Sequence, residues 1–144
     1  MRCVRTLSAA ALAALLATPA LAADVTVSDA WFRALPAGLP AGGYFTLHNA
    51  GAQDAVLTGA SSPACGMVML HMSKDEGGMS QMMMVDSVTV PAHGEIAFKP
   101  GGYHLMCMKP TAAMTPGATI SVTLDFAGAS KTEARFTVKD AKGE

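Results

Sequence analysis

The sequence predicts an all-β domain with the architecture of a sandwich or a Greek-key barrel. In residues 119–126, apolar side chains alternate strictly with Ser, Thr and Asp, which is the period-2 pattern of a half-buried strand. Residues 134–138 repeat this alternation. Short clusters of Gly and Pro separate such segments at regular intervals, as in folds built from many short strands. No segment after residue 22 carries the apolar stripe of an amphipathic helix.

The first 22 residues are interpreted as a secretory signal peptide rather than as part of the fold. Arg2 and Arg5 give a positive start to an apolar run at 7–16. Ala20-Leu21-Ala22 then supplies the small-x-small pattern of a cleavage site. The apolar run is too short to span a bilayer comfortably, although an uncleaved membrane anchor is the alternative. No Cys lies beside the cleavage point, so we expect no lipid anchor and a periplasmic protein.

Cleavage would leave residues 23–144 as one domain. Removing two of the ten basic residues and none of the eleven acidic residues changes the net charge from −1 to −3, so we expect no nucleic-acid partner. With 51% hydrophobic and 15% charged residues, the composition excludes disorder. No later apolar run is long enough for a transmembrane helix. We therefore expect a soluble monomer without stable membrane insertion.

Nine short segments after the signal peptide fit β-strands. In order they are 25–31, 44–47, 55–60, 67–72, 82–90, 95–98, 103–108, 119–126 and 134–138. Gly and Pro mark the turns between them at 36–43, 77–78, 91–94, 100–102 and 116–117.

Two cysteines, Cys65 and Cys107, remain once Cys3 has left with the signal peptide. In an oxidising envelope they could form a disulfide, which would stabilise a loop of this length by about 4 kcal/mol. They could also be two small buried apolar residues. The sequence leaves both interpretations open.

Methionine and histidine are concentrated in one part of the chain. Nine of the eleven methionines lie in 67–108, together with three of the four histidines, His71, His93 and His104. Within it, His71 is followed by Met82 after ten residues, and His104-Leu105-Met106 follows after a further twenty-one. The other two histidines, His48 and His93, lie beside turns and are interpreted as solvent-facing or hydrogen-bonded.

This combination of donors predicts a site for a soft monovalent metal. Thioether sulfur is a soft, uncharged ligand and imidazole is borderline, so the pair suits Cu(I). Mg²⁺ and Ca²⁺ prefer oxygen, and Met is not a normal zinc ligand. For any single methionine, core packing is the simpler interpretation, but two histidines and a methionine excess in one region favour the metal.

The strand pattern predicts that these donors converge. Residues two apart in a strand share a face. The sets expected to share a face are His104 with Met106, His71 with Met67 and Met69, and Met82 with Met84. Leu105 and Cys107 then point into the core, and Gly77-Gly78 lets the two segments that it joins approach each other.

The same residues resemble those of a known family, the periplasmic copper chaperones called PCu(A)C. The hallmark of that family is His-(Met)-x10-Met-x21-His-x-Met, which His71, Met72, Met82, His104 and Met106 match in type and spacing. Three further stretches are similar to the family, namely Ala30-Trp31-Phe32-Arg33, the segment at 43–49 and the segment at 99–106.

The resemblance implies a cupredoxin-like Greek-key barrel that binds Cu(I) through His71, Met82, His104 and Met106. Met83 and Met84 flank Met82, so the register could shift by one residue, and Met82 is the preferred ligand. It also implies copper delivery in the periplasm to a copper-accepting protein, in many members the copper centre of cytochrome c oxidase, often alongside Sco-type proteins. Some members carry a His- and Met-rich C-terminal extension that binds Cu(II). The tail of this chain after Phe136 contains neither residue, so no second site of that kind is expected.

Other functions fit the sequence less well. A copper- or silver-buffering protein would use the same site without a dedicated recipient. A blue-copper carrier needs a second His after its Cys, and no His follows Cys107. A plain envelope domain without metal is a further alternative. An enzyme is not expected, because the chain has no nucleophile-elbow motif and no Gly-rich phosphate loop.

Overall fold

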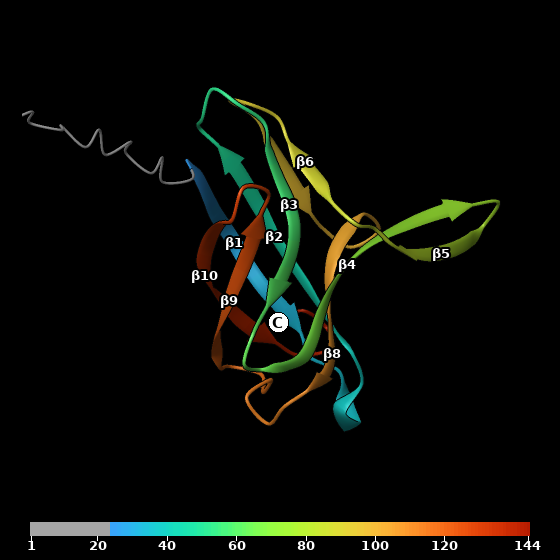
Figure 1. Ribbon diagram of the computed structural model, residues 1–144. Helices are drawn as coiled ribbons and strands as arrows, with labels where there is room; N and C mark the ends of the chain where they lie inside the picture. The colour runs from blue at the N-terminus through green and yellow to red at the C-terminus, as the bar shows by residue number, and fades with distance from the viewer. Residues whose placement is uncertain (1–23) are drawn as a thin grey trace, which may run out of the picture.

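Seven strands hydrogen-bond into a closed ring in the computed structural model, which describes residues 24–144 (Figure 1). They are β1 (Val25–Arg33), β2 (Ala41–Asn49), β3 (Ala55–Ser61), β4 (Cys65–Glu76), β8 (Tyr103–Pro110), β9 (Thr119–Phe126) and β10 (Ser130–Lys139). Around the barrel the order is β4-β8-β2-β1-β10-β9-β3, and the pairing of β3 with β4 closes it. Only the β1–β10 pair of this ring is parallel.

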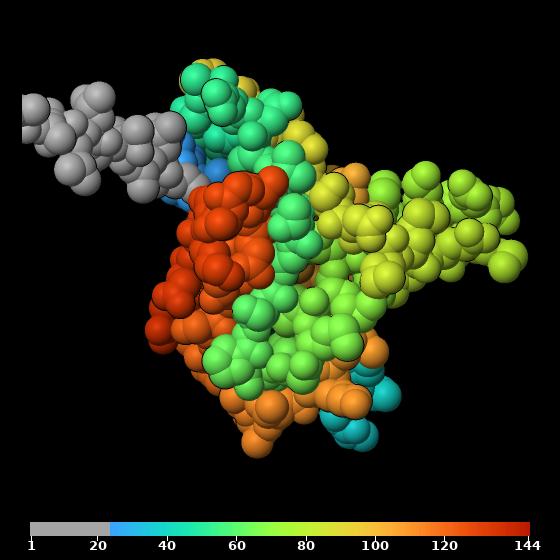
Figure 2. Space-filling view, viewed as in Figure 1, coloured from blue at the N-terminus to red at the C-terminus, as the bar shows by residue number. Residues whose placement is uncertain are grey.

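Three shorter strands extend the ring. β5 (Met79–Met84) pairs with β4, β6 (Val88–Val90) with β3, and β7 (Glu95–Phe98) with β2. A 3-10 turn, η1 (Pro36–Gly38), precedes β2. The hairpin of β4 and β5 stands away from the barrel, as the space-filling view shows (Figure 2). Every residue of β5 is exposed.

The expected single strand at 82–90 is therefore wrong in detail. The chain leaves β5 after Met84 and starts β6 at Val88. At the break, the backbone N–H of Val85 donates to the carbonyl of Leu70 at 3.0 Å. The chain changes partners here from β4 to β3, so one continuous strand cannot form.

The core fills the barrel as the alternation predicts. In β2 every second residue is buried, and in β9 Ile120, Val122, Leu124 and Phe126 are the buried set. Phenylalanines from different strands meet inside, with the ring of Phe45 at 4.3 Å from Phe98 and 5.4 Å from Phe136. The predicted all-β barrel is confirmed.

A disulfide joins Cys65 at the start of β4 to Cys107 in β8. The two Cα atoms are 5.4 Å apart, and 42 positions separate the cysteines in the chain. Cys107 is also fully buried. The structure thus resolves the alternatives that the sequence left open, because the bridge forms and one of its cysteines contributes to the core.

Two expectations concern the beginning of the chain and possible membrane segments. The segment 1–22, which is expected to be a signal peptide, lies outside the described residues. Between residues 24 and 144 the structure contains no helix that is long and apolar enough to cross a membrane.

Candidate metal centre

The outer face of β4 and β8 carries a ladder of histidine and methionine pairs. His71 lies directly opposite His104, Met69 opposite Met106 and Met67 opposite Met108. Directly opposed side chains in an antiparallel pair share one face and lie next to each other. The residues between them, Leu70 and Leu105, are buried in the core. The expected division of β8 into a donor face and a core face is confirmed.

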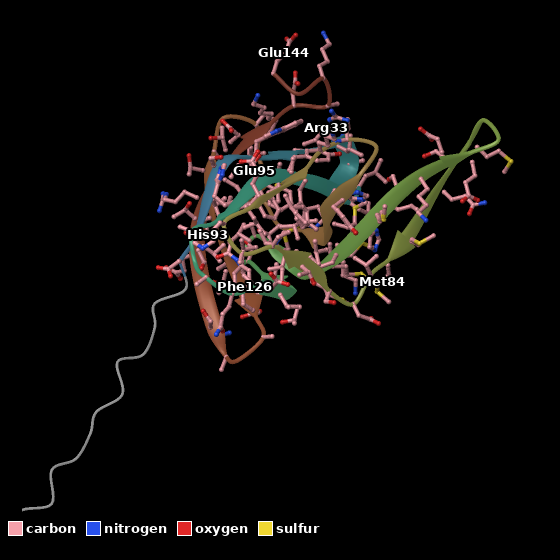
Figure 3. The ribbon with its side chains drawn as sticks, turned by 90° about the horizontal axis from the view of Figure 1, so that it is seen from above. Arg33, Met84, His93, Glu95, Phe126 and Glu144 are labelled. Atoms are coloured by element: carbon pink, nitrogen blue, oxygen red, sulfur yellow. A yellow bond between two sulfur atoms is a disulfide. The ribbon has the colours of Figure 1, made fainter. Side chains whose placement is uncertain are left out.

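β5 adds a third strand to this face. Met84 lies directly opposite His71 on β4, and Met82 lies opposite Ser73, two pairs further along the hairpin. Met82 and Met84 are both exposed, at 56% and 62%. Figure 3 shows Met84 at the base of the projecting hairpin.

The structure brings three of the four predicted ligands together and places the fourth at the margin. His71, His104 and Met106 occupy neighbouring positions of the ladder. Met82 is on the same face, diagonal to His71 across the hairpin, within reach for a long side chain. Met84, which lies two residues after Met82 in the chain, occupies the position opposite His71. Met72, whose partner is Met83, points to the other face of the hairpin.

His104 presents one ring nitrogen that is ready to bind a metal. Its side chain is buried, with 4% exposed, and its Nδ1 lies 3.1 Å from the carbonyl oxygen of Gly102. A carbonyl only accepts hydrogen bonds, so Nδ1 carries the proton and Nε2 carries a lone pair. Nε2 is buried and has no partner among residues 24–144. Such a second hydrogen bond is how proteins orient ligand histidines. Because the acceptor is a backbone atom of Gly102, no side chain in the sequence signals it.

His71 supplies the second nitrogen. Its Nδ1 is likewise buried and lacks a partner within the described part of the chain. The rings of His71 and His104 meet edge to face, with 5.6 Å between their centres. Burial, and secondly the charge of His104, lower the pKa of His71, so its neutral, ligating form is favoured. Buried polar atoms without partners are rare in native proteins, and two on facing rings point to a shared ligand.

Aromatic residues form the far side of the site. The ring of Tyr44 lies 6.3 Å from His104, and Trp31 lies 4.8 Å beyond Tyr44. Gly42 is opposite Met106, and a Cβ on it would meet the Tyr44 hydroxyl at 2.7 Å. Glycine at this position therefore lets Tyr44 lie across β2 beside the donors. The guanidinium of Arg33 covers the rings of Trp31 and Tyr44 at 5.4 and 5.6 Å.

Thioethers are needed to complete any coordination shell at this histidine pair. Within residues 24–144, no group of three or more His, Cys, Asp or Glu is placed to hold a metal ion. The donors that share the face with the two imidazoles are methionines. This set is neutral and soft, which suits a monovalent soft ion better than a hard dication.

The two histidines that were interpreted as lying outside the site do so. His48 contacts the Ser28 hydroxyl at 2.8 Å and the Glu95 carboxylate at 3.0 Å. His93 is exposed in the turn after β6, with a positive φ of 53°.

Comparison with known proteins agrees with this geometry. Residues 25–138 match the model of the family described as putative lipoprotein LpqE-like. The chain is 35% identical over 128 residues to the putative lipoprotein Lxx21020 of Leifsonia xyli subsp. xyli, covering 88% of this chain and 76% of that protein.

Two solved structures of the PCuAC group share the fold. The copper-bound PCuAC domain from PmoF2 has a TM-score of 0.68 at 20% identity, over 81% of this chain and 93% of that one. The solution structure of CuI-DR1885 from Deinococcus radiodurans has a TM-score of 0.66 at 32% identity, over 83% of this chain and 81% of that one. The resemblance to the PCu(A)C family is confirmed. The chain therefore belongs to the LpqE-like family, and its barrel is a domain of the PCuAC type.

Proposed function

We propose that this protein is a periplasmic copper chaperone that binds Cu(I) as its cargo through His71, His104, Met106 and Met82. The observation that carries the proposal is the pair of buried ring nitrogens without partners, Nδ1 of His71 and Nε2 of His104, on a face otherwise lined by thioethers. A copper ion between them would satisfy both nitrogens.

The donor set favours Cu(I). Four neutral ligands leave the charge of a monovalent ion unchanged, and a partly buried site tolerates a single charge better than a double one. Thioethers also stay available in an oxidising compartment, where free thiols tend to form disulfides. A relative with 32% identity, DR1885, has been solved with Cu(I), which supports the assignment. The related domains are described by the copper that they bind, so we propose a carrier rather than an enzyme.

The hairpin supports delivery as opposed to storage. Both proposed imidazole ligands and Met106 lie on barrel strands, whereas Met82 lies on β5, which pairs with β4 at the edge of the sheet. A ligand on a projecting hairpin can be exchanged for a donor of a recipient without opening the barrel. Transfer to a copper-accepting protein, such as a cytochrome c oxidase subunit or a Sco-type protein, is the proposed outcome. Copper or silver buffering without a recipient is the alternative.

X-ray absorption of the Cu(I)-loaded protein, prepared without oxygen, tests the site. We expect two nitrogen and two sulfur neighbours. A copper coordination shell of sulfur alone, or of nitrogen and oxygen alone, would contradict the proposed ligand set. Mixing the loaded protein with a copper-free recipient domain then tests delivery, because a dedicated recipient should take the copper faster than it dissociates into solution, whereas a buffering protein would transfer it only through the free ion.

Comparison of two leucine variants identifies the hairpin ligand. Met82→Leu and Met84→Leu both conserve volume approximately, and both positions are exposed, so neither should alter folding. We expect Met82→Leu to lower the Cu(I) affinity by about 10-fold or more, because even mutation of residues that only support metal ligands lowers metal affinity about 10- to 100-fold. Met84→Leu should have a smaller effect. Competition titration with a Cu(I) chelator measures both, and Met79→Leu is the control. The opposite order of effects would assign the ligand to Met84.

Acid should weaken Cu(I) binding because protons compete for the same imidazole nitrogen. The pKa of His71 is lowered by burial, so the loss should begin below the usual histidine value of about 6.5. The unfolded chain then binds more protons than the folded one in this range, so the metal-free protein should also lose stability as the pH falls below about 6.5. Chelator competition and urea unfolding at about pH 7.5 and about pH 5 measure both effects. Equal affinities at the two pH values would exclude histidine ligation.

A further inference from the structure

Three methionines on the β4 and β8 strands of this face remain after the proposed copper site is complete. Met67, Met69 and Met108 lie on the same outer face of β4 and β8 as His71 and His104. Met67 is directly opposite Met108, and Met69 is directly opposite Met106. Opposed Cβ atoms in such pairs are about 4.5–5.5 Å apart, so the three side chains are immediate neighbours.

These methionines do not fill the core. Met67 is 58% exposed, and Met69 and Met108 are partly exposed. The packing on this part of the barrel comes from the opposite face of the same strands, where Leu70, Leu105 and Cys107 are buried. The usual explanation of a methionine cluster, that it fills a gap in the core, therefore does not apply here.

The disulfide holds the two strands together at this point. Cys107 lies between Met106 and Met108 in β8, and Cys65 precedes Met67 by two residues in β4. The bridge therefore crosslinks the two strands at the place where the three thioethers face one another. Together with the backbone pairing of β4 and β8, this covalent tie holds the two strands in register.

We propose that Met67, Met69 and Met108 form a second site for a soft monovalent cation, Cu(I) or Ag(I), in addition to the site proposed above. Three thioethers are neutral and soft and match the preference of such ions. They carry no proton in the physiological range, so loading of this site releases none. The site accepts the ion by coordination only, with no change in oxidation state.

Its position gives the second site a role in loading the first. Met69 is two residues from His71 along β4 and directly opposite Met106. An ion held by the thioethers can therefore exchange ligands one at a time along the ladder, from Met67 and Met108 through Met69 and Met106 to the two imidazoles. The outer site receives the ion, and the histidine site holds it.

Ag(I) titration followed by native mass spectrometry tests the proposal with the protein in its disulfide-bonded form. We expect the unmodified protein to bind two ions and the double variant Met67→Leu, Met108→Leu to bind one. His104→Asn, which removes only the histidine site, should also bind one. The matched control is Met79→Leu, Met83→Leu, which changes two exposed methionines on the other face of the hairpin and should still bind two.

The two sites can fail independently. If the protein binds one ion that His104→Asn abolishes and Met67→Leu, Met108→Leu leaves intact, the second site does not exist. If it binds one ion that Met67→Leu, Met108→Leu abolishes and His104→Asn leaves intact, the second site exists and the proposed histidine site is wrong. In ¹³C-methyl-methionine spectra, the second equivalent of Ag(I) should shift the signals of Met67, Met69 and Met108. Shifts confined to other methionines would overturn the assignment. If the double variant does not fold, as judged by circular dichroism, the single variant Met67→Leu replaces it in the ion count and should also bind one Ag(I).

Discussion

Replacing His104 by Asn is expected to lower the Cu(I) affinity at least about 100-fold, since even outer-shell partners of metal ligands are worth 10–100-fold. The amide nitrogen of Asn can still donate to the carbonyl of Gly102, which Nδ1 of His104 contacts at 3.1 Å. The substitution therefore keeps the local hydrogen bond and removes only the nitrogen that has no partner, Nε2. Chelator competition under anaerobic conditions measures the change.

His93→Asn is the matched control for this variant. The exchange is the same, but His93 is exposed in a turn with φ at 53°, a conformation that Asn adopts readily. Its Cu(I) affinity should equal that of the unmodified protein. If His104→Asn retained full affinity while folding normally, the buried nitrogens would have to be explained without copper.

Removing the disulfide is expected to lower the free energy of unfolding by about 4 kcal/mol. The double variant Cys65→Ala, Cys107→Ala opens a loop whose ends are 42 positions apart, so the unfolded chain regains the conformational entropy that the bridge removed. Urea unfolding followed by circular dichroism measures the loss. Cu(I) binding should weaken as well, because Cys107 is adjacent to the proposed ligand Met106.

The reduced, unmodified protein separates the two effects of the alanine substitutions. Cys107 is fully buried, so Ala there also removes packing atoms, whereas reduction breaks only the bond. The reduced protein should be destabilised by nearly as much as the double variant. A loss below about 1 kcal/mol after reduction would show that the bridge contributes little to stability, contrary to the loop-entropy argument.

The strand pattern could be predicted because burial in a barrel imposes a period of two. Residues 119–126 show it without exception, and the same four side chains are buried in the structure. The segment 82–90 contains no Gly or Pro to mark a break, and its one turn signal, Asp86-Ser87, is weaker than those elsewhere in the chain. The break at Val85 arises because the chain passes from one neighbouring strand to another, which is a property of the whole fold.

The candidate site was predictable to the extent that it depends on local geometry. The common face of His104 and Met106 follows from their spacing in one strand. The pairing of His71 with His104, and the position of Met84 opposite His71, depend on the alignment of strands far apart in the sequence. For the same reason the sequence could not decide between a disulfide and two free thiols at Cys65 and Cys107.

The projecting hairpin divides the molecule into a rigid part and a locally labile part. β5 is exposed throughout and hydrogen-bonds to β4 at the edge of the described sheet, so its amides should exchange with solvent by local opening at a small fraction of the global unfolding free energy. An ion that coordinates Met82 would couple this ribbon to the barrel and slow that exchange. Losing the ion then reverses only the local ordering, so repeated cycles of capture and release leave the barrel folded.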